Sequence, residues 1–293
     1  HGVEGYCGSA LQTQWLTHHA GERPHQLRLV NIHALNPYGM AWVRRVNEDN
    51  VDLNRNFVDW SQPAPSNADY DGIADLVVPA EWTADEQQRT LEALLALVAE
   101  WGFPKVQAVV SGGQYAHPKG VFYGGTEPVW SHRWLRGWCA DNLGDAQRVI
   151  IVDLHTGLGP WGHGELIASA APGEPMFDRA AALWPDAKSM LAGDSVSATL
   201  AGDWLNIADQ LAPHAEVTPI CIEYGTVDGI TVLQSLRADA WLHGHGDPTA
   251  PEAAAVRAQV EPLPVTYSRD VGEIAVLEDD GTFFYINPGG QTL

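Results

Sequence analysis

The chain has 293 residues, of which 45% are hydrophobic and 18% are charged. This balance is typical of a globular protein that is long enough for one large α/β domain or two small ones. The formal net charge of −21 argues against nucleic-acid binding, because an acidic surface repels phosphate backbones. No stretch approaches about 18 consecutive apolar residues, so the sequence predicts no membrane-spanning helix.

The cysteines and the start of the chain carry little further signal. Cys7, Cys139 and Cys221 lie far apart and form no C-x-x-C pair, which disfavours a disulfide framework and a thiolate zinc site. We expect each of them to be a small buried side chain. The sequence opens at His1 without a basic stretch followed by an apolar run, so no signal peptide is visible. We therefore expect a cytoplasmic protein.

The first half of the chain contains one expected strand and two expected helices. The apolar run at 27–32 predicts a buried strand that leads into a turn at 36–39. A polar loop with two prolines follows at 62–71. Thr83 is expected to cap a helix that ends near Trp101, and another helix is expected at about 131–143.

The second half alternates strands with helices. Strands are expected at 148–154, 165–168 and 217–223, and helices near 176–184, 203–211, 230–242 and 251–260. This alternation predicts a sheet with helices on both faces. We expect an α/β fold with three α/β/α layers and a mostly parallel mixed sheet. Near the end of the chain, the segments 273–277 and 282–286, joined by Asp-Asp-Gly, predict a hairpin.

A formal G-x-G-x-x-G pattern occurs at 157–162, directly after the strand expected at 148–154. A dinucleotide site needs such a loop to open a helix whose N-terminus holds the pyrophosphate. Here the loop leads into another expected strand. We therefore interpret the pattern as a glycine-rich turn.

The first of three polar clusters is His1-Gly2-Val3-Glu4-Gly5. His1 and Glu4 can face one metal ion if the chain turns into a helix at this point. Zinc binds both imidazole nitrogen and carboxylate oxygen, and a catalytic zinc typically has three protein ligands and a water. The alternative is a helix-capping Glu beside a surface His.

The second cluster, Asp153-Leu154-His155, follows an apolar strand. This position puts His155 at the carboxyl edge of the sheet, where open α/β sheets bind ligands. Asp153 points to the same side and could orient the imidazole ring. The alternative is a histidine that is merely hydrogen-bonded at a strand end.

The third cluster is the run 52–57, Asp-Leu-Asn-Arg-Asn-Phe, preceded by Arg44 and Arg45. An Asn–Arg pair such as Asn54 and Arg55 suits a carboxylate, because a guanidinium can contact both oxygens. Arg45 could polarise a carbonyl and stabilise the oxyanion that forms from it. The alternative is a network of Asp and Arg on the surface.

The order of these motifs resembles that of the zinc carboxypeptidase superfamily: H-x-x-E, N-P-x-G, an Arg, D-L-N-R-N-F, a strand ending in His and a strand ending in Glu. Within it, RRVNEDNVDLNRNF is similar to the branch that contains succinylglutamate desuccinylase and aspartoacylase. HGVEG, DLHTG and IEYGT most resemble an uncharacterised bacterial family of carboxypeptidase-like proteins. The resemblance covers about residues 1–241.

The resemblance implies one zinc ion per chain, held by His1, Glu4 and His155. Glu223 matches the general base that activates the zinc-bound water. A strand that ends in this residue would also place a carboxylate at the sheet edge, where a partly desolvated Glu can accept a proton. The alternative for Glu223 is a solvated carboxylate at the strand end.

The resemblance also implies substrate contacts. Arg45, with Arg44 as the alternative, matches the carbonyl-polarising Arg, and Asn54 and Arg55 match the residues that hold the substrate carboxylate. The strands that precede H-x-x-E in the family are missing from this sequence. Two tyrosines at 123 and 224 are candidates for the substrate-capping Tyr, and the tail from about 265 has no counterpart.

These observations lead us to expect a catalytic domain at 1–264 and a β-hairpin tail at 265–293. The expected activity is zinc-dependent hydrolysis of an amide bond next to a free carboxylate, as in a metallocarboxypeptidase, on a small-molecule or peptide substrate. Two alternatives remain: an N-acyl-amino-acid deacylase of the desuccinylase and aspartoacylase type, and a non-catalytic carboxylate-binding relative. A copper monooxygenase with an N-terminal His is a further alternative, but such proteins are all-β.

Overall fold

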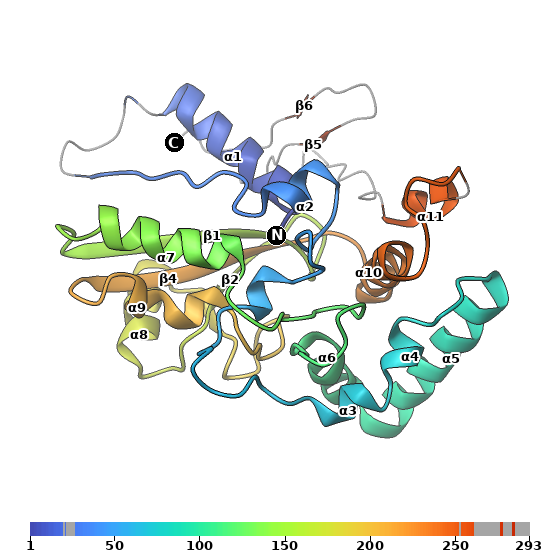
Figure 1. Cartoon of the computed structure of the whole chain (residues 1–293). Coiled ribbons are helices and arrows are strands. Elements are labelled where there is room, and N and C mark those ends of the chain that lie inside the picture. Colours follow the sequence, from blue (N-terminus) through green and yellow to red (C-terminus); the bar gives the residue numbers. More distant parts are fainter. Residues whose placement is uncertain (20, 22–26, 252, 261–275, 278–282, 285–293) are drawn as a thin grey trace.

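The computed structural model describes residues 1–19, 21, 27–251, 253–260, 276–277 and 283–284 (Figure 1). Its centre is a sheet with strand order β1-β4-β2-β3. The strands are β1 (Arg148–Gly157), β2 (Gly164–Ala168), β3 (Lys188–Ser189) and β4 (Glu216–Gly225). The pairs β1–β4 and β2–β3 are parallel, and β2–β4 is antiparallel. The sheet is therefore mixed and mostly parallel, as the sequence predicted.

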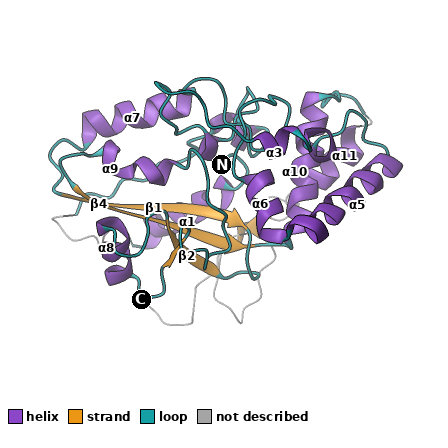
Figure 2. Ribbon diagram, turned by 90° about the horizontal axis from the view of Figure 1, so that it is seen from below, coloured by secondary structure: helices purple, strands orange, loops and turns teal. Residues whose placement is uncertain are grey.

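Helices cover both faces of this sheet (Figure 2), with α7 (Trp130–Asn142) and α9 (Ala208–Leu211) on one side and α8 (Pro175–Leu183) on the other. Val217 packs with Ala208 of α9, whereas Ile220 packs with Ala180 of α8. An odd and an even position of one strand point to opposite faces. The expected three-layer α/β/α fold is confirmed.

The first helix, α1 (Gly5–His18), lies over β1 on the same face as α8. At Gly8, a Cβ atom would lie 3.4 Å from the Cβ of Leu154, and Leu154 is the register partner of Ile222. Ile222 and Ile220 share the face that α8 covers. The turn that holds His1 and Glu4 is thereby fixed against the end of β1.

A second group of helices gathers to one side of the sheet (Figures 1 and 2) and shares an apolar core that includes Tyr70, Val77, Leu94 and Val110. The helices that contribute to this core are α3 (Ala68–Asp71), α4 (Ala74–Val77), α5 (Ala84–Trp101), α6 (Phe103–Ser111) and α10 (Gly229–Gly244). The remaining helices are α2 (Pro37–Ala41), η2 (Leu53–Arg55), η3 (Trp204–Ile207) and α11 (Ala253–Val260). Within the described part of the chain, no helix combines the length and the apolar character needed to cross a bilayer.

Local signals explain most helix boundaries. The Thr83 side chain accepts a hydrogen bond from the backbone of Glu86 at 3.2 Å and caps α5, as predicted. Gly102 ends this helix with φ +84°, which a residue without Cβ adopts readily. The sequence did not predict that α6 begins at once, with Pro104 in its first turn, a position where proline is well tolerated.

The strand predicted at 27–32 is wrong. The segment is unpaired in the structure, and Leu27 and Val30 are half exposed. A groove of about 1420 Å³ separates this segment from β1 and is lined by both. An apolar run forms a strand only when a neighbour is close enough to supply backbone hydrogen bonds.

Two smaller expectations differ in detail. The helix expected at 203–211 divides into η3 and α9, because Ile207, the last residue of η3, has a non-helical backbone. In the expected hairpin, β5 (Val276–Leu277) and β6 (Phe283–Phe284) do pair antiparallel. The turn expected to join them lies outside the described residues. The pattern at 157–162 is a turn between β1 and β2, as predicted.

Candidate metal centre

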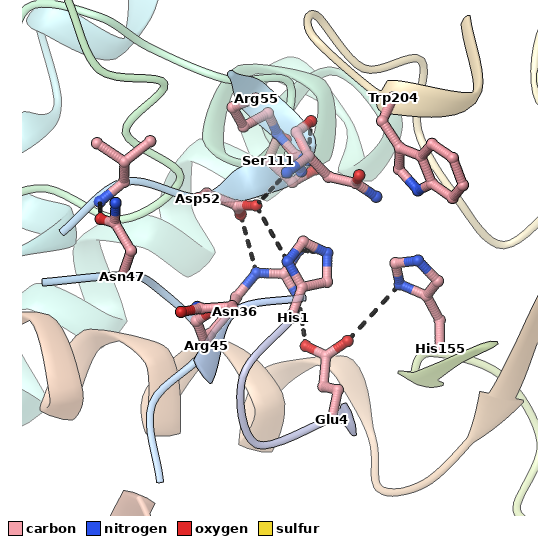
Figure 3. A network of polar contacts seen from close by, with 12 residues as sticks. His1, Glu4, Asn36, Arg45, Asn47, Asp52, Arg55, Ser111, His155 and Trp204 are labelled. Atoms are coloured by element: carbon pink, nitrogen blue, oxygen red, sulfur yellow. Dashed lines mark hydrogen bonds and ion pairs between the residues drawn. The ribbon is translucent and has the colours of Figure 1, made fainter. Parts of the chain in front are cut away.

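Three potential metal ligands converge where α1 and β1 meet (Figure 3). His1 and Glu4 come from the turn before α1, and His155 comes from the carboxyl end of β1. One ligand atom from each of the three lies within 4.8 Å of the others. The structure therefore brings together the three potential ligands that the sequence suggested, and we call them the metal-ligand group.

His1 has a buried imidazole with an unsatisfied nitrogen. Its Nδ1 is the one buried side-chain N or O atom among the described residues that makes no hydrogen bond. A carboxylate oxygen, Oδ1 of Asp52, is 3.3 Å away. Because buried polar atoms nearly always have a hydrogen-bond partner, a ring nitrogen that faces a carboxylate but makes no hydrogen bond fits a metal ligand.

A carboxylate orients the imidazole ring of His155 through the nitrogen that does not face Glu4. Its Nε2 lies 2.7 Å from Oδ2 of Asp153, which also accepts a 2.6 Å bond from the Trp204 indole. The other ring nitrogen, Nδ1, faces Glu4 at 3.7 Å. A carboxylate that holds the far nitrogen of an imidazole is the usual support of a metal-binding histidine.

The charges around His155 stabilise its protonated form. Burial alone would lower its pKa, but the charge and hydrogen bond of Asp153 and the hydrogen bond with Glu4 raise the pKa to about 10. Burial would also raise the pKa of Glu4, yet the charge of Arg45 holds it below its ordinary value. The group therefore holds a proton where a cation could bind instead.

Glu223 lies beside this group. It is the register partner of His155 on the neighbouring parallel strand, so both side chains lie at the carboxyl edge. Its Oε1 accepts a 3.1 Å bond from the backbone of Leu158, and a Cβ at Gly157 would come within 2.9 Å of that oxygen. Burial raises the pKa of Glu223 to about 6, a value that suits a general base.

The two adjacent arginines have different partners. Arg45 donates from Nε to Asp52 at 2.9 Å and also pairs with Glu4. Arg44 instead forms a buried ion pair with Asp239 of α10 at 2.9 Å. Of the two candidates for a carbonyl-polarising residue, the structure brings Arg45 to the metal-ligand group.

Arg55 makes a different kind of contact. Its Nε and Nη2 donate to the carbonyl of Ser111 at 2.9 and 2.6 Å, and Nη1 donates to the carbonyl of Asn54 at 2.9 Å. The side chain is 2% exposed and lies over the ring of Phe122, 4.9 Å from its centroid. We call Arg55 with these two carbonyls the Arg55 anchor. Each Nη makes one of these bonds and carries a second hydrogen that neither bond uses.

Asp52 links the Arg55 anchor to the metal-ligand group. One of its oxygens accepts from the backbone of Asn54 at 3.0 Å, and the other accepts from Arg45. Burial would raise the pKa of Asp52, but the charges of Arg45 and Arg55 hold it below its ordinary value. The D-L-N-R-N-F motif is thus buried, which excludes the alternative of a surface network.

Sequence reasoning missed several residues of this region. Trp204 and Ser111 carry no local signal, because they come from η3 and from the end of α6, which are distant in sequence from the other residues of the site. Cys221 could have been found, since it lies two residues before Glu223 and so shares its face. Of the tyrosines, Tyr123 packs in an apolar cluster with Val51, and residue 224 directly follows Glu223 and points to the opposite face.

The comparisons with known proteins place the chain in one sequence family. A family model described as "Protein of unknown function (DUF2817)" matches residues 1–263. No curated protein and no solved structure matches the chain. The matched range includes every residue of the metal-ligand group and the Arg55 anchor.

Proposed function

The chain belongs to the DUF2817 family of proteins of unknown function, and we propose that it is a zinc-dependent hydrolase of amide bonds next to a free carboxylate, acting as a metallocarboxypeptidase. The observation that carries this proposal is the convergence of His1, Glu4 and His155 within 4.8 Å, with Glu223 on the adjacent strand. The motif resemblance to the zinc carboxypeptidase superfamily supports it.

The donor set fits zinc. Two imidazole nitrogens and one carboxylate oxygen are ligands that catalytic zinc commonly has, whereas Mg²⁺ and Ca²⁺ prefer oxygen. The Nδ1 of His1, which is buried without a hydrogen bond, supports this assignment. When bound, zinc would polarise the amide carbonyl and make a water molecule more acidic.

The protein side chains have separate roles in this proposal. Glu223 accepts a proton from the attacking water and delivers it to the departing amine nitrogen, for which its raised pKa is suited. Arg45 places a positive charge beside the metal ligands and stabilises the negative charge that develops on the carbonyl oxygen. Asp153 orients His155.

The substrate carboxylate is assigned to Asn54 and Arg55. The support is that each Nη of Arg55 retains a hydrogen beyond the bonds to Ser111 and Asn54. Burial strengthens a charge-assisted bond to a carboxylate. Such a contact would select substrates with a free acid over their amides.

A deacylase of the desuccinylase and aspartoacylase type is the second candidate, because the run 44–57 is similar to that branch of the superfamily. The same side chains would act on an N-acyl amino acid, and the difference lies in the leaving group rather than in the metal.

The test is metal analysis followed by an activity screen. We expect about one zinc per chain, and hydrolysis of either C-terminal dipeptides or N-acyl amino acids that a chelator abolishes and zinc restores. Each substrate is paired with its carboxamide as a control. Zinc without turnover on either class would favour a non-catalytic carboxylate-binding protein, and copper in place of zinc would contradict the metal assignment.

A further inference from the structure

Cys221 is a free cysteine that the proposed hydrolysis does not use. Its sulfur lies within 4.8 Å of a nitrogen of His155 and an oxygen of Glu223, and these two atoms also lie within 4.8 Å of each other. The three side chains form a second group of potential metal ligands, which shares His155 with the first group.

The sheet holds this second group in place. Cys221 is the register partner of Asp153, and Glu223 is the register partner of His155, on two parallel strands. Residues two apart on a strand point to the same face. The thiol and the carboxylate are thus adjacent on one face, and the imidazole comes from the neighbouring strand.

The thiol packs against apolar side chains. Cys221 packs in a buried cluster with Ile167, Met190 and Leu205, so it also serves as a small core residue. These three neighbours are apolar, whereas the charges of Glu223 and Asp153 also act on the thiol. A low-dielectric environment also strengthens the attraction between a bound cation and a thiolate.

The donor chemistry selects a particular kind of ion. Sulfur, imidazole nitrogen and a single carboxylate oxygen are poor ligands for hard cations but suit soft or borderline ones. We propose that Cys221, His155 and Glu223 form a second cation site, overlapping the first, that takes a soft divalent ion such as Cd²⁺ through a thiolate bond. When the ion binds, the thiol releases its proton to the solvent and the sulfur bonds the metal.

Because the two sites overlap, an ion in the second site would inhibit the hydrolysis, a consequence that rests on the proposed function. An ion in the second site withdraws His155 from His1 and Glu4, and it occupies the Glu223 oxygen that would otherwise accept a proton. A soft metal ion therefore competes with zinc for the imidazole of His155 at the carboxyl edge of the sheet.

The test is a Cd²⁺ titration of the metal-free protein followed by ultraviolet absorbance. We expect a thiolate-to-cadmium charge-transfer band that saturates near one ion per chain, and that is absent from both Cys221→Ser and Cys221→Ala. The matched controls are Cys7→Ser and Cys139→Ser, which remove the other cysteines of the chain and should keep the band. A ¹¹³Cd NMR spectrum of the wild type reports sulfur ligation directly, whether or not the Cys221 variants fold.

A further variant separates this proposal from the zinc proposal. His1→Ala removes a ligand that belongs to the first group alone, so it should lose zinc but keep the cadmium band. Loss of the band in His1→Ala would show that the thiol is only an extra ligand of the first ion. A wild type without a band under excess Cd²⁺, or a band that survives in both Cys221 variants, would overturn the second site.

Discussion

The metal-ligand group and the Arg55 anchor are neighbours on the two sides of Asp52, but they are stabilised in opposite ways. In the first, His1, Glu4 and His155 face one another and further charged groups, and a buried imidazole nitrogen makes no hydrogen bond. In the second, the guanidinium donates to neutral carbonyls that cannot titrate. The first is a set of competing charges and the second is a nearly satisfied network.

This difference separates a reactive arrangement from a supporting one. Polar groups with unsatisfied atoms and shifted pKa values are typical of functional sites, whereas satisfied buried networks mainly fix a conformation. The metal-ligand group should therefore respond strongly to metal and pH, and the Arg55 anchor should respond mainly through stability. The predictions below test that contrast.

Replacement of His155 by Ala should have the largest effect. The variant loses a metal ligand and the imidazole that Asp153 orients, so we expect zinc content and activity to fall together to background. The measurement is zinc per chain by atomic emission, alongside turnover. The matched control is His163→Ala, an exposed histidine in the turn after β1, which should retain both. Full zinc occupancy in His155→Ala would mean that another residue is the third ligand.

Replacement of Glu223 by Gln should leave zinc in place but lower turnover by ~10² or more. In the wild type, kcat/KM should also fall as the pH drops below the pKa of Glu223, about 6 without metal, because the protonated acid cannot act as a base. A bound cation lowers that pKa further. The control is Glu216→Gln, at the exposed start of the same strand. An unchanged kcat in Glu223→Gln would remove this residue from the mechanism.

Zinc affinity should depend steeply on pH. The metal-free protein holds a proton on His155, whose pKa is about 10, and zinc binds the neutral ring. Zinc affinity should therefore fall by about tenfold for each pH unit of acidification between pH 8 and 6, because one proton is displaced per ion. Asp153→Asn should weaken zinc binding by roughly 10- to 100-fold. Isothermal titration in buffers of different ionisation enthalpy counts the released protons, and a pH-independent affinity would contradict this picture.

The contrast also explains what the sequence could predict. The strands β1 and β4 were predictable because their apolar runs are long and end in polar residues, and parallel pairing then brings His155 next to Glu223. His1 and Glu4 were predictable because a helix follows them directly. Each of these signals is local in the sequence, and the fold brings the residues together at one edge of the sheet.

The remainder depends on contacts between distant segments. Arg55 has the same sequence signature as a carboxylate-binding residue, but the position of Ser111, at the end of a helix that was not predicted, determines where its donors go. The segment 27–32 has the composition of a strand, and yet it lies across a groove from β1. Neither outcome is encoded within a few residues of the motif.

Arg55→Lys tests the anchor. Lys cannot reproduce the planar set of donors, so we expect the free energy of unfolding to fall by about 1–3 kcal/mol, as for lost buried hydrogen bonds. If Arg55 also contacts substrate, KM should rise more for a free acid than for its amide. Arg44→Lys is the matched control, because Arg44 is equally buried but pairs with Asp239. It should lose stability without distinguishing the two substrates. An equal KM change on both substrates in Arg55→Lys would leave Arg55 a purely structural role.

The smallest expected effect concerns His132, which supports the segment that follows Arg55. Its ring stacks on Phe57 with centroids 4.1 Å apart, its Nδ1 lies 3.1 Å from the carbonyl of Asn56, and its Nε2 accepts from Arg136 at 2.9 Å. Burial, reinforced by the charge of Arg136, lowers the pKa of His132 to about 4. The folded protein therefore keeps this imidazole neutral.

An unfolded histidine titrates near 6.5, so between about pH 6.5 and 4 the unfolded chain binds more protons at this position than the folded chain. The contribution of His132 to stability is therefore complete above about 6.5 and declines on acidification, with a slope of at most about 1.4 kcal/mol per pH unit for one proton. His132→Gln should be less stable at neutral pH but show a shallower loss between pH 6.5 and 4 in urea titrations. His214→Gln, at an exposed histidine, should retain the wild-type slope. If both variants lose stability as steeply as the wild type, protonation of His132 does not contribute to acid unfolding.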